Sequence, residues 1–320
     1  MLDPDAQRFL QHAAEANPPA METLTPAEAR AQFDAFMPMT QGPREEVAEV
    51  RNTSLHGLLG PIPVRIYRSE AAPAANAPCM VYFHGGGWVI GGLDTHDGLC
   101  RSIANLGEAV VISVDYRMGP EFPFPAAVED CAAALRHILA DATALGIDPN
   151  RIAVGGDSAG GNLAAVMAIA SRNGDAPPLA FQMLFYPVTD LSQTQDSYRS
   201  YAEGYGLTTA GMAWFRQHYL GEEGHLNDWR VSPLRAHSLT GVAPAFVLTA
   251  GFDPLHDEGL EYAARLREDG VMTVLDDNPG QIHGFVSMDG VIAEARPALA
   301  RAMAAWRAAE AVVVAPDAAL

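Results

Sequence analysis

The sequence predicts an α/β fold in which a mostly parallel β-sheet carries helices on both faces. Short apolar runs, each the length of a buried strand, alternate with stretches in which apolar residues recur at helical spacing. This alternation favours parallel strands, because each helix returns the chain to the edge of the sheet where the previous strand began. The predicted strands are residues 79–83, 110–114, 152–155, 181–186, 245–250 and 271–275.

The beginning of the chain has a different pattern. Apolar residues at helical spacing predict a helix within residues 2–13, and Thr25-Pro26-Ala27-Glu28 has the form of a capping box that starts a second helix. Residues 46–55 and 61–68 then have the character of strands, with two glycines between them. We expect these two strands to pair antiparallel.

A long connection interrupts the alternation between the strands 181–186 and 245–250. It is rich in aromatic residues, and a connection of this length usually has helices of its own and a functional role. We therefore expect a helical cap over the carboxyl edge of the sheet, built from residues 1–46 and the insertion 191–241. The main domain is expected to span residues 47–320.

The charge of the chain excludes several kinds of partner. Asp and Glu number 39 against 20 Lys and Arg, which gives a formal net charge of −19. A field of this sign repels nucleic acids and anionic membranes. The first residues lack the features of a secretory signal, and no apolar run approaches the length of a membrane span. We therefore expect a cytoplasmic protein that binds neither nucleic acid nor membrane.

The strongest local signal is Gly156-Asp157-Ser158-Ala159-Gly160, which lies between a predicted strand and an alanine-rich helix. In this context the pattern G-x-S-x-G predicts a nucleophilic serine on a tight turn, where side chains at the glycine positions would clash. The alternative is an ordinary glycine-rich turn whose serine caps the helix. We take Ser158 as the candidate nucleophile.

Three consecutive glycines follow another predicted strand, in His84-Gly85-Gly86-Gly87-Trp88. Such glycines let backbone N–H groups approach the oxygen that becomes negative during acyl transfer. We expect an oxyanion hole formed by the N–H groups of Gly85, Gly86 and Ala159. A phosphate-binding loop is the alternative, but the motif lacks the lysine followed by Ser or Thr, and Ile90 stands where a dinucleotide fingerprint needs glycine.

A serine nucleophile needs an acid and a histidine, which follow it in that order in folds of this kind. Only His256 and His283 lie beyond the candidate acid Asp253. His256 is too close to Asp253 in sequence to bridge easily between this acid and the serine, whereas His283 follows the last predicted strand on a loop. We therefore predict Asp253 and His283 as the partners of the serine. Asp257 and Glu258 rank behind Asp253, because carboxylates at the start of a helix are usually caps.

Asp94-Thr95-His96-Asp97 could be mistaken for a group of metal ligands. A polar turn that caps the following helix explains the same residues more simply. The three cysteines, Cys79, Cys100 and Cys131, have no spacing typical of a metal site or of a disulfide framework. We therefore expect no metal.

Together these motifs resemble the bacterial hormone-sensitive-lipase family (family IV) of esterases. The similarity rests on residues 84–88 and 156–160, Tyr116-Arg117-Met118-Gly119-Pro120-Glu121, Phe124-Pro125-Ala126-Ala127, Asp253-Pro254-Leu255 and His283-Gly284-Phe285. The resemblance implies the α/β-hydrolase fold with an eight-stranded sheet and a helical cap. It also implies hydrolysis of carboxylic esters through an acyl-enzyme, no cofactor and, in many members, a homodimer.

On this basis we expect a serine carboxylesterase that acts on small, short-chain esters. Trp88, Tyr186 and the aromatic insertion are expected to line the substrate pocket. Two other functions stay open, namely another acyl-transfer enzyme, such as an amidase or acyltransferase, and a non-catalytic receptor. Activity on amides, or transfer to an added alcohol in preference to water, would identify the first. A receptor should have lost a member of the triad, and none is missing here.

Overall fold

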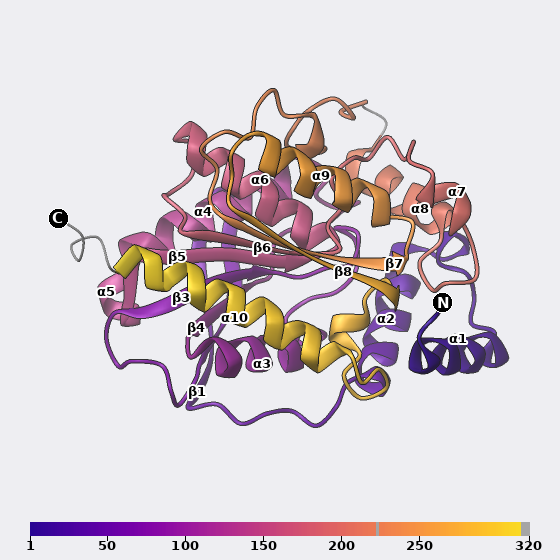
Figure 1. Cartoon of the computed structure of the whole chain (residues 1–320), viewed down its shortest axis with the longest axis horizontal. Coiled ribbons are helices and arrows are strands. Elements are labelled where there is room, and N and C mark those ends of the chain that lie inside the picture. The colour runs from indigo at the N-terminus through magenta and orange to yellow at the C-terminus, as the bar shows by residue number, and fades with distance from the viewer. Residues whose placement is uncertain (222–223, 315–320) are drawn as a thin grey trace.

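The computed structural model describes residues 1–221 and 224–314. In this part of the chain eight strands form one sheet that runs through the centre of the molecule (Figure 1). Along the sheet the order is β1-β2-β4-β3-β5-β6-β7-β8. The strands are β1 Glu49–Gly57, β2 Gly60–Arg68, β3 Ala77–Phe83, β4 Val110–Val114, β5 Ile147–Asp157, β6 Phe181–Phe185, β7 Ala245–Phe252 and β8 Thr273–Ile282.

The pairing of the strands confirms the predicted, mostly parallel sheet. β2 pairs antiparallel with both β1 and β4, and all the other neighbours are parallel. The prediction for the last strand was partly wrong, because β8 begins at Thr273 rather than at residue 271 and continues to Ile282. β8 lies at the edge of the sheet and pairs only with β7. Because one side of an edge strand faces solvent, β8 contains polar residues, and the continuous apolar run that identifies a buried strand is absent from it.

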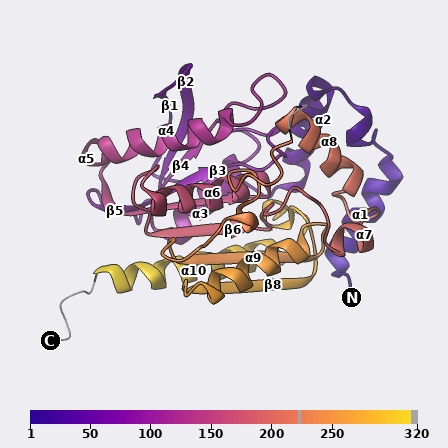
Figure 2. The same ribbon diagram turned by 90° about the horizontal axis from the view of Figure 1, so that it is seen from above.

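Helices cover both faces of the sheet, and each face has its own apolar core. One face packs against α4 Ala126–Ala140, α6 Ala159–Asn173 and α9 His256–Glu268, and the other packs against α3 Asp97–Gly107 and α10 Ala295–Val314 (Figures 1 and 2). The short helix α5, Ala142–Leu145, precedes β5. None of the helices in the described residues is long and apolar enough to cross a membrane.

The N-terminal helices and the long insertion lie at the same end of the molecule, beside the carboxyl ends of β7 and β8 (Figures 1 and 2). The helices are α1 Pro4–Ala16 and α2 Pro26–Thr40 from the N-terminal segment, and α7 Ser197–Ser200 and α8 Thr209–Leu220 from the insertion. The predicted capping box is present at the start of α2, where Thr25 and Glu28 exchange hydrogen bonds. Within the insertion predicted at 191–241, residues 222 and 223 lie outside the described residues.

Candidate active site

Ser158 lies on the sharp turn between β5 and α6. Its backbone has φ 55° and ψ −116°, a left-handed conformation that is strained for a residue with a side chain. A Cβ atom at Gly156 would lie 2.3 Å from the backbone carbon of Gly160, and one at Gly160 would lie 1.9 Å from the carbonyl oxygen of Phe83. The turn therefore requires both glycines of the motif.

Asp253 and His283 form a close pair at the ends of β7 and β8. The two strands pair up to Phe252 and Ile282, so each of these two residues follows its strand directly. His283 Nδ1 lies 2.7 Å from Asp253 Oδ2, and the fully buried Asp253 also accepts a 2.9 Å hydrogen bond from the Leu255 N–H. Since a carboxylate only accepts, Nδ1 of His283 carries a proton and its Nε2 is left for another partner.

Ser158 and His283 line the same cavity of about 320 Å³. Its wall opposite the sheet is mainly apolar and comes from two places in the sequence, the N-terminal helices and the insertion. The large apolar residues of this wall are Phe9, Phe33, Phe36, Met37, Leu207, Met212 and Phe215. The arrangement brings a serine hydroxyl, a histidine and an apolar binding space together, which is what acyl transfer requires.

The alternative residues have other partners. His256 contacts Asp257 at 3.2 Å and Asp277 at 3.1 Å. Asp257 also accepts the backbone N–H of Ser197 at 2.9 Å. Neither His256 nor Asp257 is among the residues that line the cavity.

The oxyanion loop, residues 84–87, does not match the prediction in full. The N–H of Gly85 donates to Asp157 Oδ1 at 3.0 Å and is therefore already bonded, so the structure does not favour the predicted role of Gly85 as a donor to the substrate. Gly86 and Gly87 both line the cavity. Gly86 has φ +113°, and a Cβ there would lie 2.1 Å from the Ile90 carbonyl oxygen, so this position needs glycine for the course of the loop itself.

The predicted pocket residues Trp88 and Tyr186 do not line the cavity. Trp88 is fully buried and stacks on Tyr219, with ring centroids 4.2 Å apart and planes within 5°. Tyr186 packs against the ring of His283 at 4.7 Å and against Phe285, so it lies behind the histidine rather than beside the substrate space. Both residues support the site from within the core, which corrects the prediction.

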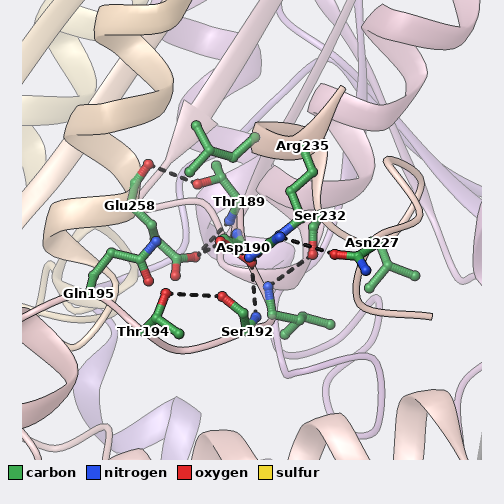
Figure 3. Close-up of polar contacts among 12 residues, drawn as sticks. Thr189, Asp190, Ser192, Thr194, Gln195, Asn227, Ser232, Arg235 and Glu258 are labelled. Carbon is green, nitrogen blue, oxygen red and sulfur yellow. Dashed lines mark hydrogen bonds and ion pairs between the residues drawn. The ribbon is translucent and has the colours of Figure 1, made fainter. Parts of the chain in front are cut away.

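The insertion is fastened to the start of α9 by the buried Glu258 (Figure 3). Glu258 Oε1 accepts the N–H groups of Thr189 at 2.7 Å and Asp190 at 3.3 Å. Tyr198 donates to Oε2 at 3.1 Å. Asp190 in turn forms an ion pair with Arg235 at 3.0 Å. Burial raises the pKa of Glu258 well above its usual range, despite these donors. Glu258 is therefore a structural anchor outside the cavity.

Known proteins share the fold of this chain. Residues 80–287 match a protein family described by the α/β-hydrolase fold, and the chain belongs to this family. The solved structure of LAE6, an α/β-hydrolase from the metagenome of Lake Arreo in Spain, has a TM-score of 0.93 and 44% sequence identity. That match covers 96% of this chain and 98% of LAE6.

Similar proteins define the class of enzyme more narrowly. The carboxylesterase NlhH of Mycobacterium tuberculosis is 40% identical over 294 residues, which cover 90% of this chain and 92% of NlhH. An ethyl acetate hydrolase of Pseudomonas putida is 40% identical over 304 residues, which cover 92% of this chain and 95% of that protein. The class that these relatives share is the carboxylic-ester hydrolases, and this chain falls within it.

Proposed function

We propose that the protein hydrolyses short-chain carboxylic esters, with Ser158 as nucleophile, His283 as general base and Asp253 as the acid that orients the histidine. The 2.7 Å contact between His283 Nδ1 and Asp253 Oδ2 carries this proposal. It fixes the protonated nitrogen of the histidine on the carboxylate, so that Nε2 is free to take a proton from the serine.

The reaction follows from these positions. His283 removes the proton of Ser158 as the hydroxyl attacks the ester carbonyl, and the imidazolium then gives that proton to the departing alcohol. Water hydrolyses the acyl-enzyme by the same route. We assign the stabilisation of the oxyanion to the N–H groups of Gly86, Gly87 and Ala159. Gly87, which lines the cavity, takes the place of Gly85, whose N–H is already bonded to Asp157.

The limits of the cavity support a preference for short acyl chains. Phe9 and Phe36, whose ring centroids are 6.0 Å apart, line both this cavity and an outer cleft between α1 and α2. The two rings therefore lie where the cavity and the cleft adjoin. Under the proposal an acyl chain meets these rings when it extends from Ser158 towards the N-terminal helices.

Two measurements test the proposal. An organophosphate should label Ser158 alone, as shown by mass spectrometry of peptides, and Ser158→Ala should remain unlabelled. Initial rates on 4-nitrophenyl esters should be highest for acetate to butyrate and should decrease towards palmitate. Labelling of another serine would overturn the assigned nucleophile, and a rate that rises up to palmitate would overturn the chain-length preference. Faster turnover of the matching anilides would instead identify an amidase.

The homodimer and the cytoplasmic location expected from the sequence remain predictions. Size-exclusion chromatography with light scattering tests the first, and fractionation of cells that express the full chain tests the second.

A further inference from the structure

A second buried carboxylate, Asp157, lies beside the nucleophile and is not used by the proposed mechanism. Its side chain accepts hydrogen bonds from Tyr82 Oη at 2.8 Å and from the Gly85 N–H at 3.0 Å, and it lies 3.3 Å from His96 Nε2. Asp157 also lines the cavity, although its exposed fraction is only 6%. An ionised carboxylate is therefore held close to the place where Ser158 is proposed to react.

His96 is the buried partner of this carboxylate, with an exposed fraction of 1%. Because a carboxylate only accepts hydrogen bonds, the Nε2 atom of His96 carries the proton that points towards Asp157. The other nitrogen, Nδ1, lies 2.9 Å from Thr95 Oγ1, whose position is fixed by 3.0 Å contacts with the N–H and carbonyl of Gly92. His96 is the N-cap residue of α3, within the capping turn predicted at residues 94–97, but its side chain makes no cap hydrogen bond.

The same carboxylate determines the position of the oxyanion loop. A Cβ atom at Gly85 would lie 2.2 Å from Asp157 Oδ2, so the loop rests directly on the carboxylate. The carbonyl of Gly85 accepts Nδ1–H of His84 at 2.7 Å, and Tyr116 Oη donates to the His84 carbonyl at 2.6 Å. Both polar backbone groups of Gly85 are thus held by side chains immediately before Gly86.

We propose that His96 is a positioning residue for ester hydrolysis: through Asp157 and the Gly85 N–H it holds the oxyanion loop so that the next two amides face the reacting carbonyl. This inference rests on the proposed role of Gly86 and Gly87 as donors. Preorganised donors accelerate acyl transfer only when their position is fixed before the reaction, and the side chains behind them supply that rigidity.

The hydrogen bonds to Asp157 also affect the charge that the substrate meets. A carboxylate beside a developing oxyanion opposes the new negative charge unless donors offset it. Burial would raise the pKa of Asp157, but the charge and hydrogen bond of His96 and the hydrogen bond of Tyr82 outweigh burial, and the pKa is lowered. Asp157 thus remains a carboxylate, and the donors His96, Tyr82 and Gly85 offset part of its charge beside the substrate.

The test compares His96→Phe, which keeps a ring of similar size but cannot donate, with His96→Gln, whose amide can donate to Asp157. His96→Phe should lower kcat by on the order of 10- to 100-fold with little change in KM, and His96→Gln should recover most of the loss. His137→Phe, on α4, is the matched control and should match the wild type. Affinity for a boronic acid, which forms a tetrahedral adduct on the serine, should decrease by the same factor as kcat.

Two outcomes would overturn the proposal. One is a folded His96→Phe protein with unchanged kcat and boronic acid affinity, and the other is a loss confined to KM. If His96→Phe does not fold, Tyr82→Phe decides instead, because it removes one donor to Asp157 and should lower kcat and boronic acid affinity together by on the order of three- to tenfold. Failure of the proposed function is distinguishable, since it requires an active Ser158→Ala protein or a wild type without esterase activity.

Discussion

The two sides of the cavity are held in place by different kinds of interaction. On the side of the sheet, Ser158, His283 and the oxyanion loop are fixed by turns that need glycine and by hydrogen bonds as short as 2.6 Å. On the opposite side, α1, α2 and α8 contribute mainly apolar side chains that are positioned by packing. Chemistry at this site therefore depends on a few atoms in fixed geometry, whereas the shape of the cavity depends on side-chain volume, which tolerates substitution.

The largest effect should come from the side of the sheet, at the histidine. His283→Ala removes the proposed base and should lower kcat by on the order of 10⁴-fold or more. His256→Ala, which removes a histidine paired with Asp257 and Asp277 outside the cavity, should change kcat by less than about threefold. Steady-state kinetics on 4-nitrophenyl butyrate measures both. A reversed order of the two losses would show that the wrong histidine has been assigned.

The acid should give the next largest effect. Asp253→Asn keeps the shape of the side chain but favours the wrong tautomer of His283, so kcat should decrease by on the order of 10³- to 10⁴-fold while the protein stays folded. Asp257→Asn is the matched control, because this carboxylate contacts Ser197 and His256 instead. Its kcat should stay within a few-fold of the wild type, and circular dichroism should show equal folding. Similar losses in the two variants would contradict the assignment of Asp253.

A smaller effect is expected on the apolar side, and it should change selectivity rather than chemistry. Phe36→Ala removes one of the two rings between the cavity and the outer cleft. The ratio of kcat/KM for octanoate to that for butyrate should rise by about tenfold, since extra methylenes gain apolar burial. Phe122→Ala, at a phenylalanine that is 44% exposed and outside the cavity, is the control. An unchanged ratio in Phe36→Ala would mean that these rings do not limit the acyl chain.

The smallest effect on activity is expected at Glu258, where stability should change instead. Glu258→Ala leaves two buried backbone N–H groups without an acceptor and should lower the free energy of unfolding by about 2–4 kcal/mol. Glu258→Gln keeps an acceptor for them and should cost less than about 1 kcal/mol at pH 7. Urea denaturation monitored by fluorescence measures both variants.

The two Glu258 variants also predict a dependence on pH. The pKa of Glu258 is raised in the folded protein, so its contribution to stability is greatest in acid and decreases as the pH rises above the value of an unfolded glutamate. The stability of Glu258→Gln relative to the wild type should therefore improve from pH 5 to pH 8. A constant difference over this range would show that Glu258 is ionised throughout.

The sequence predicted the parts of the site that depend on backbone geometry. Glycines around Ser158 are required by distances that leave no room for a Cβ, so the turn has a recognisable pattern. Asp253 and His283 each follow a strand directly, and parallel strands bring their carboxyl ends to one edge. The number of strands, eight, was predicted from the resemblance of these motifs to a known family.

Other parts depend on partners that a pattern does not show. Gly85 and Gly87 belong to the same run of three glycines, and the sequence does not distinguish them. In the structure the N–H of Gly85 is bonded to Asp157, whereas Gly87 lines the cavity. Trp88 follows the glycines directly, yet it stacks on Tyr219, far along the chain. Phe36 belongs to an ordinary apolar stripe of a helix, and nothing in that stripe indicates that one side of it faces a cavity.

The attachment of α2 has a consequence for how the substrate range of such a protein changes in evolution. Arg30 donates to the Val89 carbonyl at 2.8 Å and to the Gly119 carbonyl at 2.9 Å, and it pairs with Glu121 at 2.7 Å. One side chain therefore links the N-terminal segment to the loops after β3 and β4. Substitutions of the apolar residues of α1 and α2 can therefore reshape one wall of the cavity while this arginine keeps the segment attached. Changes of this kind would alter the range of substrates and leave the ends of β7 and β8 in place.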